Sequence, residues 1–280
     1  MVSLSSLLFN FYKLKKINNV DFIDNFPLEK VQQIFQDKTH KNLDKKLCLL
    51  SYLIYFYNDK ILFNKFLLEW NIKFNVYCVD KGIDDNYTLI FGVYEMENEL
   101  VVIFKGTSNI EDNMNNINFG KSTIPDIPGR VHSGFKSILF EMNNDTQTPN
   151  ILEILNILDT YPNTTKIHIS GHSLGGAIST IFYSYLLYYR SFPLNLVTFG
   201  SPRVGNKLFC DNIKGIRYVN NNDIIPHLPL KIGLNLKCTS SDYNSYNDYK
   251  EKIHLKNKYI DSYFWSIKDH SICEYFKNLI

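Results

Sequence analysis

The sequence lacks the features that mark a disulfide-stapled, membrane-spanning or nucleic-acid-binding chain. Its five cysteines are odd in number and scattered, with no CxxC pair and no histidine at zinc-finger spacing, so we expect neither a disulfide framework nor a metal site. The longest apolar runs, 47–57 and 178–189, are too short and too often interrupted by polar residues to span a bilayer. The formal net charge is only +2 and neither sign forms a long run, which argues against a nucleic-acid partner.

The amino terminus also lacks a convincing secretory signal. The stretch MVSLSSLLFNFYKLKK carries its lysines after the apolar residues rather than before them, which inverts the charge order of a signal peptide. On this ground we expect a soluble chain and favour an intracellular location over secretion, while leaving the location open.

The chain does have the material for a sizeable core. Of its 280 residues, 45% are hydrophobic and 15% are aromatic. We find no internal repeat and no linker, so we expect one domain over 1–280. Between about 27 and 70, apolar residues recur at helical spacing with polar breaks near Thr39 and Asn58. This pattern predicts two or three helices and makes 1–85 a mainly helical N-terminal layer.

From Tyr87 onward the pattern changes to strands that alternate with helices. Two β-branched and aromatic runs, 87–95 and 100–104, flank the polar segment MENE and predict a hairpin. The predicted helices that follow are 135–141, 151–158 and 177–189, and the predicted strands are 166–170, 194–199 and 216–220, with 234–237 as a further candidate. Such alternation is typical of an α/β protein whose mostly parallel central sheet is flanked by helices on both faces.

The segment that carries the clearest chemistry joins a predicted strand to a predicted helix. The strand KIHIS is followed by Gly171-His-Ser-Leu-Gly-Gly176 and then by the apolar helix. A strand, a tight Gly-x-Ser-x-Gly turn and a helix together form a nucleophile elbow, in which glycines allow a sharp turn that exposes the serine hydroxyl. Ser173 is therefore the predicted nucleophile; the alternative is a Gly-rich turn with an N-cap serine.

A serine nucleophile needs a histidine to accept its proton and a carboxylate to orient that histidine. In hydrolases with this elbow the chain order is Ser, acid, His. Asp223 is the favoured acid, because it follows a short predicted strand and precedes a Pro-containing loop; Asp211 and Asp242 are weaker candidates.

The histidine candidates downstream of Asp223 are His227, His254 and His270. His227 is too close in sequence to Asp223 to reach back easily to the serine, and His254 lies in a Lys-rich, surface-like stretch. We assign the role of general base to His270, just before the last predicted helix. His132 and His172 are expected to shape the site through packing or hydrogen bonds.

Six motifs in order now stand out, and together they resemble the fungal-type class 3 lipase family. They are 102–107 (VIFKGT), 131–135 (VHSGF), 171–176 (GHSLGG), 197–206 (VTFGSPRVGN), 223–229 (DIIPHLP) and Asp269-His270. The resemblance covers roughly 87–276 and implies an α/β-hydrolase fold with that region as the catalytic core. It also implies a Ser173, Asp223 and His270 triad that acts on lipid esters without a cofactor.

The resemblance extends to the oxyanion hole, the set of donors that stabilises the negative charge of the reacting carbonyl oxygen. In the family the segment that matches Phe-Lys-Gly-Thr contributes such donors, which places the role on Thr107 here. The second donor is the backbone N–H of Leu174, directly after the nucleophile. Lys105 stands where the family usually has Arg, which keeps the charge but loses bidentate geometry.

The segment 108–119 lies where lipases of this family carry a lid. Ile110, Met114 and Ile117 fall at i, i+4 and i+7, which forms one apolar stripe on an otherwise acidic and amide-rich helix. Such a helix could cover the site in water and turn its stripe toward a lipid surface. The alternative is a plain surface helix.

The sequence thus favours a serine hydrolase that cleaves carboxylic ester bonds of lipids, with a triacylglycerol lipase as the leading hypothesis. The expected substrate lies at a membrane or lipid-droplet surface, and protein partners stay unknown. Phospholipase A1 or broad carboxylesterase activity is the alternative, because fold and triad do not choose the substrate. A lipase-like binding or signalling protein that has lost turnover is a more distant one.

Overall fold

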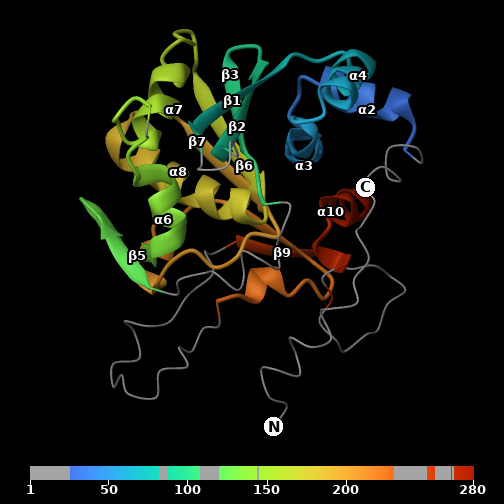
Figure 1. The fold of residues 1–280 in the computed structure, drawn as a ribbon. Coiled ribbons are helices and arrows are strands. Elements are labelled where there is room, and N and C mark those ends of the chain that lie inside the picture. The colour runs from blue at the N-terminus through green and yellow to red at the C-terminus, as the bar shows by residue number, and fades with distance from the viewer. Residues whose placement is uncertain are drawn as a thin grey trace.

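The described chain builds a central sheet between two layers of helices (Figure 1). The computed structural model describes residues 26–81, 87–107, 120–143, 145–229, 251–255, 266 and 268–280. One layer contains α2 (Leu28–Gln36), α3 (Leu43–Leu53), α4 (Lys60–Trp70) and α10 (Ile272–Leu279); the other contains α6 (Ser133–Phe140), α7 (Asn150–Leu158) and α8 (Leu174–Tyr189). Helices therefore cover both faces of the sheet, as the alternating sequence pattern predicts.

The main sheet follows the order β1-β2-β3-β6-β7-β8-β9. Its strands are β1 (Phe74–Lys81), β2 (Tyr87–Met96), β3 (Glu99–Phe104), β6 (Lys166–His172), β7 (Leu194–Phe199), β8 (Ile216–Asn220) and β9 (Glu251–Leu255). The pairs β1–β2 and β2–β3 are antiparallel, and the four pairs from β3 to β9 are parallel. This mixed, mostly parallel sheet confirms the predicted α/β class.

Strand β3 shows why both faces of the sheet must be covered. Its residues from Leu100 to Phe104 are all buried, and successive side chains of a strand point to opposite faces. Leu100, Val102 and Phe104 belong to the core beneath α6, α7 and α8, whereas Val101 and Ile103 belong to the core shared with α3, α4 and α10. A strand that is apolar at every position is typical of a parallel sheet buried between two layers.

The helical layer from the N-terminal part of the chain packs directly on the sheet. Helix α2 buries Val31, Ile34 and Phe35, one stripe at i, i+3 and i+4. Helix α4 begins after Asp59, whose side chain accepts a hydrogen bond from the N–H of Leu62 at 3.0 Å. Helix α3 contacts β3 and β6, and α10 contacts α3. Buried residues of α2, α3, α4 and α10 therefore belong to one core, although α10 ends the chain.

The structure also contains strands that the sequence analysis missed. Strand β1 pairs with β2, and the Lys-rich stretch around His254 forms the edge strand β9 rather than an irregular surface segment. Lysine on an edge strand discourages pairing with another chain. Its charge also interrupts the apolar pattern by which a strand is predicted. The Pro-containing segment before α6 forms a small hairpin, β4 (Lys121–Ile124) and β5 (Ile127–His132). The candidate strand 234–237 lies outside the described residues.

Short elements complete the framework. They are the 3-10 turns η3 (Ile54–Phe56), η4 (Ile225–His227) and η5 (Lys268–His270) and the one-turn helix α9 (Lys207–Cys210). Within the described part of the chain, the helices fall short of the length and apolar character that a bilayer crossing requires.

Candidate active site

The predicted nucleophile lies at the strained junction between β6 and α8. Ser173 has φ 58° and ψ −127°, a conformation that costs a non-glycine residue of order 1–3 kcal/mol and persists only where the surroundings enforce it. Its N–H donates to the carbonyl of Phe199 at 2.9 Å, which ties the turn to the end of β7. The serine is 3% exposed. The local backbone is that of a nucleophile elbow.

The two predicted oxyanion segments lie against each other. In the parallel pairing of β3 with β6, Phe104 is opposite Gly171, so Thr107 and Ser173 follow adjacent strand ends. A Cβ on Gly175 would lie 2.1 Å from the carbonyl oxygen of Phe104, which shows how closely the first turn of α8 approaches the end of β3. Leu174, the first residue of α8, and Thr107 are both half-buried beside this contact.

The predicted base and acid are in direct contact. Nδ1 of His270 lies 2.7 Å from Oδ2 of Asp223, and both side chains are buried. Asp223 follows β8, and its second oxygen, Oδ1, accepts the backbone N–H of Ile225 at 2.9 Å. The other ring nitrogen of His270, Nε2, is buried and has no hydrogen-bond partner among the residues that the structure describes. That nitrogen is the one that would accept a proton from a serine.

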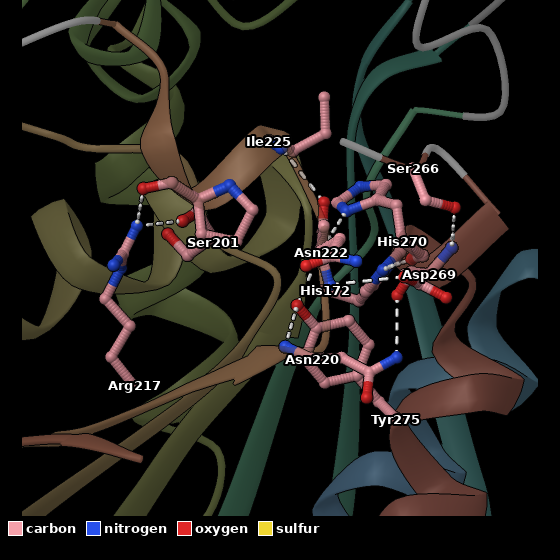
Figure 2. Close-up of polar contacts among 12 residues, drawn as sticks. His172, Ser201, Arg217, Asn220, Asn222, Ile225, Ser266, Asp269, His270 and Tyr275 are labelled. Atoms are coloured by element: carbon pink, nitrogen blue, oxygen red, sulfur yellow. Dashed lines mark hydrogen bonds and ion pairs between the residues drawn. The ribbon is translucent and has the colours of Figure 1, made fainter. Parts of the chain in front are cut away.

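A tyrosine for which the sequence predicted no role also binds the carboxylate of Asp223. The hydroxyl of Tyr275, on α10, donates to Oδ2 of Asp223 at 2.6 Å and accepts the N–H of Asn220 at 3.0 Å. Figure 2 shows Tyr275, His270 and Asn220, the last residue of β8, in one group of side chains. Burial, and then the neighbouring Asp223, raises the pKa of Tyr275 well above its ordinary value, so it stays a donor. Asp223 thus receives three hydrogen bonds.

Gly200 permits the close packing of this pair. It follows β7 with φ 60°, in the left-handed region. A Cβ at this position would lie 2.9 Å from Cε1 of His270 and 3.2 Å from Oδ2 of Asp223. The segment 197–206, which we interpreted as a loop that shapes the pocket, therefore leaves room for the imidazole ring. Because Ser173 is bonded to Phe199, the same strand end contacts both the elbow and the histidine.

A second histidine connects the elbow to the N-terminal helical layer. Nε2 of His172 donates to the carbonyl of His270 at 2.7 Å, and Nδ1 of His172 accepts from the hydroxyl of Tyr55 at 2.9 Å. The Tyr55 hydroxyl in turn accepts a hydrogen bond from the N–H of Gly106. Burial, and then the proximity of His270, holds the pKa of His172 well below its ordinary value, so the ring is neutral. The sequence analysis predicted such a supporting role for His172 but missed Tyr55.

A buried arginine secures the loop that follows Asp223. Nη2 of Arg217, on β8, donates to the carbonyls of Ser201 and Pro226 at 2.5 Å each. Figure 2 shows Arg217 beside Ser201, apart from the group of side chains around His270. The arginine therefore connects the segment after β7 to η4.

The rejected candidates lie away from this pair or outside the described chain. His227 is in η4, where its carbonyl accepts a hydrogen bond from Arg203, and His254 is exposed on β9. Asp211 forms an exposed ion pair with Lys207. Asp242 and the predicted lid residues Ile110, Met114 and Ile117 fall outside the described residues.

Comparisons with known proteins find similarity to lipases. Residues 101–232 match the family model described as Lipase (class 3). The chain is 35% identical over 151 residues to a secreted mono- and diacylglycerol lipase of Fusarium solani, which covers 52% of this chain and 43% of the relative. It is 30% identical over 159 residues to phospholipase A1-II 1 of Oryza sativa subsp. indica, covering 48% and 40%. The chain thus spans less than half the length of these curated relatives.

The fold has solved counterparts as well. The triacylglyceride lipase of Rhizomucor miehei superposes with a TM-score of 0.58 at 21% identity, over 86% of this chain and 92% of that one. The match shows that the sheet and helices described above form an α/β-hydrolase fold. Of the residues placed at the site, Tyr55, His270 and Tyr275 lie outside the part of the chain that the family model matches.

Proposed function

Because this chain belongs to the class 3 lipase family, we propose that it is a serine hydrolase that cleaves carboxylic ester bonds of lipids through an acyl-enzyme intermediate. The observation that carries the proposal is that the end of β7, at Phe199 and Gly200, contacts both a strained Ser173 at the β6–α8 elbow and a buried His270–Asp223 pair whose outer nitrogen is available. In the same proposal 1–280 forms one domain, with the helical layer of 1–85 supporting a catalytic core over 87–276.

In the proposed mechanism, Nε2 of His270 takes the hydroxyl proton of Ser173 as the serine oxygen attacks the ester carbonyl. The Asp223 carboxylate, already bonded to Nδ1, keeps the ring in the tautomer that presents a bare Nε2 and stabilises the imidazolium that forms. The same proton then passes to the alcohol leaving group. Water attacks the acyl-enzyme with His270 again as base, which releases the fatty acid and restores the serine.

The negative charge of the tetrahedral intermediate falls on the former carbonyl oxygen. We assign its stabilisation to the N–H of Leu174 and to the N–H and hydroxyl of Thr107. Support comes from the close approach of the β3 end to the first turn of α8. Preorganised donors of this kind typically lower the activation barrier by about 3–4 kcal/mol each.

For the substrate we propose triacylglycerol at a membrane or lipid-droplet surface. The fungal relative is a mono- and diacylglycerol lipase, which supports an acylglycerol, whereas the plant relative is a phospholipase A1. The test compares fatty-acid release from a triacylglycerol emulsion and from phosphatidylcholine vesicles, with the Ser173→Ala protein subtracted. Faster release from the emulsion supports the lipase; preference for the vesicles replaces it with the phospholipase.

A fluorophosphonate probe tests the nucleophile without any choice of substrate, because it labels only an activated serine. Trypsin releases Ser173 in the peptide 167–190, so one label on that serine by tandem mass spectrometry supports the assignment. Ser173→Ala should abolish labelling, and Ser137→Ala, a serine on α6 that bonds the carbonyl of Gly134, should leave it unchanged. A folded wild-type protein without the label would favour the non-catalytic binding protein.

A further inference from the structure

A second cluster of histidine and carboxylate lies at the opposite end of the strands that lead to the candidate active site. His40 belongs to the loop between α2 and α3, Glu99 is the first residue of β3, and His168 is on β6. Nε2 of His40 lies 2.8 Å from Oε2 of Glu99, and Nε2 of His168 lies 2.6 Å from the same oxygen. Residues 40, 99 and 168 are far apart in sequence, so no motif predicts this cluster.

The cluster is separate from the predicted hydrolase chemistry. Glu99 begins β3, whereas the oxyanion segment follows the last residue of that strand. At about 3.3 Å per residue, the six residues of β3 separate the two by about 20 Å. None of the hydrogen bonds given above for the triad involves His40, Glu99 or His168. The cluster therefore has no role in the mechanism proposed above.

The geometry points to a binding site for a zinc-type divalent cation, and we propose that His40, Glu99 and His168 are its three protein ligands. One ligand atom from each side chain lies within 4.8 Å of the other two. Two imidazole nitrogens and a carboxylate oxygen form a ligand set that zinc favours, with metal–ligand distances of about 2.0–2.2 Å. Tetrahedral coordination at those distances separates neighbouring ligand atoms by about 3.3 Å.

Only a small movement converts the present hydrogen-bonded arrangement into such a site. The two nitrogen–oxygen distances of 2.8 and 2.6 Å must open by about 0.5 and 0.7 Å to approach the tetrahedral separation. Glu99 has freedom to move, since 21% of its side chain is exposed, and His40 is 43% exposed. His168 is fully buried and provides the fixed point.

The tautomers can change without net loss of a proton. In the present arrangement each Nε2–H donates to Glu99. When Nε2 binds the cation, the ring proton must reside on Nδ1. Nδ1 of His168 lies 3.2 Å from the side-chain amide of Asn195, and this amide can present its oxygen by rotating half a turn. Asn195 would then orient the ligand ring, as outer partners of metal-bound histidines commonly do.

The surroundings allow a cation and its remaining ligands to enter. A cavity of about 480 Å³ opens over the cluster and is lined by His40, Glu99 and Thr165, with Lys46 and Met96 on its walls. Lys46, on the cavity wall, is already engaged, because it donates to the carbonyl of Asp37 and contacts the sulfur of Met96 at 3.6 Å. Lys166 lies opposite Glu99 in the pairing of β3 with β6. Lys38 is paired with Glu97 at 2.9 Å. Water can therefore complete the coordination from the cavity side.

A cation here would connect three parts of the fold. His40 belongs to the helical layer, and Glu99 and His168 belong to neighbouring strands of the sheet. A metal bridge would thus tie the α2–α3 loop to the amino ends of the inner strands β3 and β6. We assign the site a structural role, because the strained serine and the available histidine nitrogen lie at the other end of the strands.

The experiment measures Zn²⁺ binding to the full chain after chelator treatment, by titration calorimetry and by thermal unfolding. We expect one Zn²⁺ per chain and a higher Tm, and Co²⁺ in its place should give the visible absorption of a tetrahedral site. His40→Ala removes an exposed ligand without opening the core and should weaken Zn²⁺ binding at least about 100-fold. Glu99→Gln should weaken it as well, and Glu97→Gln, an exposed carboxylate two residues away, is the matched control.

Two results would overturn the proposal: no stoichiometric binding of Zn²⁺ or Co²⁺ to wild-type protein, or undiminished binding in both His40→Ala and Glu99→Gln. Either result would leave the cluster as a hydrogen-bonded contact between the α2–α3 loop and the amino ends of β3 and β6. Urea unfolding of each metal-free variant shows whether it is folded before titration. None of these readouts depends on ester hydrolysis, so the outcome is independent of the proposed function.

Discussion

The two ends of the parallel strands use the same side chains in opposite ways. At the carboxyl end, Asp223 contacts Nδ1 of His270 at 2.7 Å and leaves Nε2 without a described partner. At the amino end, Glu99 contacts Nε2 of both His40 and His168, and Asn195 contacts Nδ1 of His168. The pair distances are nearly equal, so distance does not distinguish the two clusters. What differs is which nitrogen the carboxylate leaves available.

The carboxylates at the two ends also differ in burial. His270 and Asp223 are 1% and 0% exposed, and three hydrogen bonds fix the carboxylate of Asp223. At the other end the side chain of Glu99 is 21% exposed. Burial alone would raise the pKa of Glu99, but hydrogen bonds from His168 and His40 hold this pKa below its ordinary value. A histidine–carboxylate pair is therefore no catalytic signature by itself. The two ends differ in a further feature, because a strained serine lies at the elbow that shares its neighbouring strand end with His270.

The sharpest test of this comparison removes the negative charge at each end. Asp223→Asn should lower kcat for a soluble ester by roughly 10⁴, because the amide favours the wrong tautomer of His270. Glu99→Gln should change kcat by less than about twofold, since Glu99 is partly exposed and lies far from the candidate active site. Both rates are measured on protein shown to be folded by urea unfolding. Equal losses in the two variants would contradict the assignment of Asp223.

A smaller effect is expected from the tyrosine that donates to Asp223. Tyr275→Phe removes a hydrogen bond to a carboxylate and leaves the N–H of Asn220 unpaired. Such bonds contribute about 1.5–3 kcal/mol, so we expect kcat to fall roughly 10- to 100-fold while KM changes little.

The matched control for that substitution is Tyr218→Phe. The hydroxyl of Tyr218, on β8, donates to Asp44, on α3, at 2.5 Å, which is also a tyrosine–carboxylate contact but joins the sheet to the helical layer. The substitution Tyr218→Phe should lower the free energy of unfolding and leave kcat unchanged. If both variants lose only stability, Tyr275 supports the core and not the orientation of His270.

A weaker effect again should follow from the hydrogen bond that connects the helical layer to the elbow. Tyr55→Phe leaves Nδ1 of His172 and the N–H of Gly106 without this partner. We expect kcat to fall about tenfold, since His172 holds the carbonyl of His270. Tyr57→Phe is the control, because the Tyr57 hydroxyl contacts the sulfur of Cys78 at 3.0 Å instead. An unchanged kcat in Tyr55→Phe would remove it from the positioning residues.

The last prediction concerns pH and the buried ring of His172. Burial, and then His270, holds its pKa in the folded protein well below the unfolded value of about 6.5. The unfolded chain therefore binds a proton that the folded chain does not. This contribution to stability is complete above about pH 6.5 and is lost as the pH falls toward the folded pKa, with a limiting slope of about 1.4 kcal/mol per pH unit.

The measurement is the free energy of unfolding in urea at several pH values between 7.5 and 5.5. His172→Gln lacks the titrating group, so its stability should fall less steeply with acid than that of the wild type. Identical slopes in the two proteins would show that His172 is protonated in the folded state, and would sink the prediction of a neutral ring.

Much of the fold could be predicted because its signals are local. The strands 194–199 and 216–220 coincide with β7 and β8, and the helix after Ser173 is α8. Periodicity and turn chemistry depend on neighbouring residues alone, so a single sequence contains them. Strands β1 and β9 were missed because each is an outer strand of the sheet, where polar and charged residues interrupt the apolar pattern by which a strand is predicted. The tyrosines around His172 and Asp223 gave no local signal, since both approach from helices remote in sequence.

The sequence by itself determined the α/β class and the elbow around Ser173, because a strand, a Gly-x-Ser-x-Gly turn and a helix are contiguous. It also predicted Asp223 and His270 as the other two members of a triad. The tertiary structure alone decided which nitrogen of His270 is available and which tyrosines bind Asp223 and His172. It also decided that His40, Glu99 and His168 meet at the amino ends of β3 and β6. These features depend on strand order and packing. They bring together groups separated by as many as 128 positions, as in the pair of His40 and His168. Short-range propensity places no constraint on such distances, whereas a close-packed core and the pairing of β3 with β6 leave few alternatives.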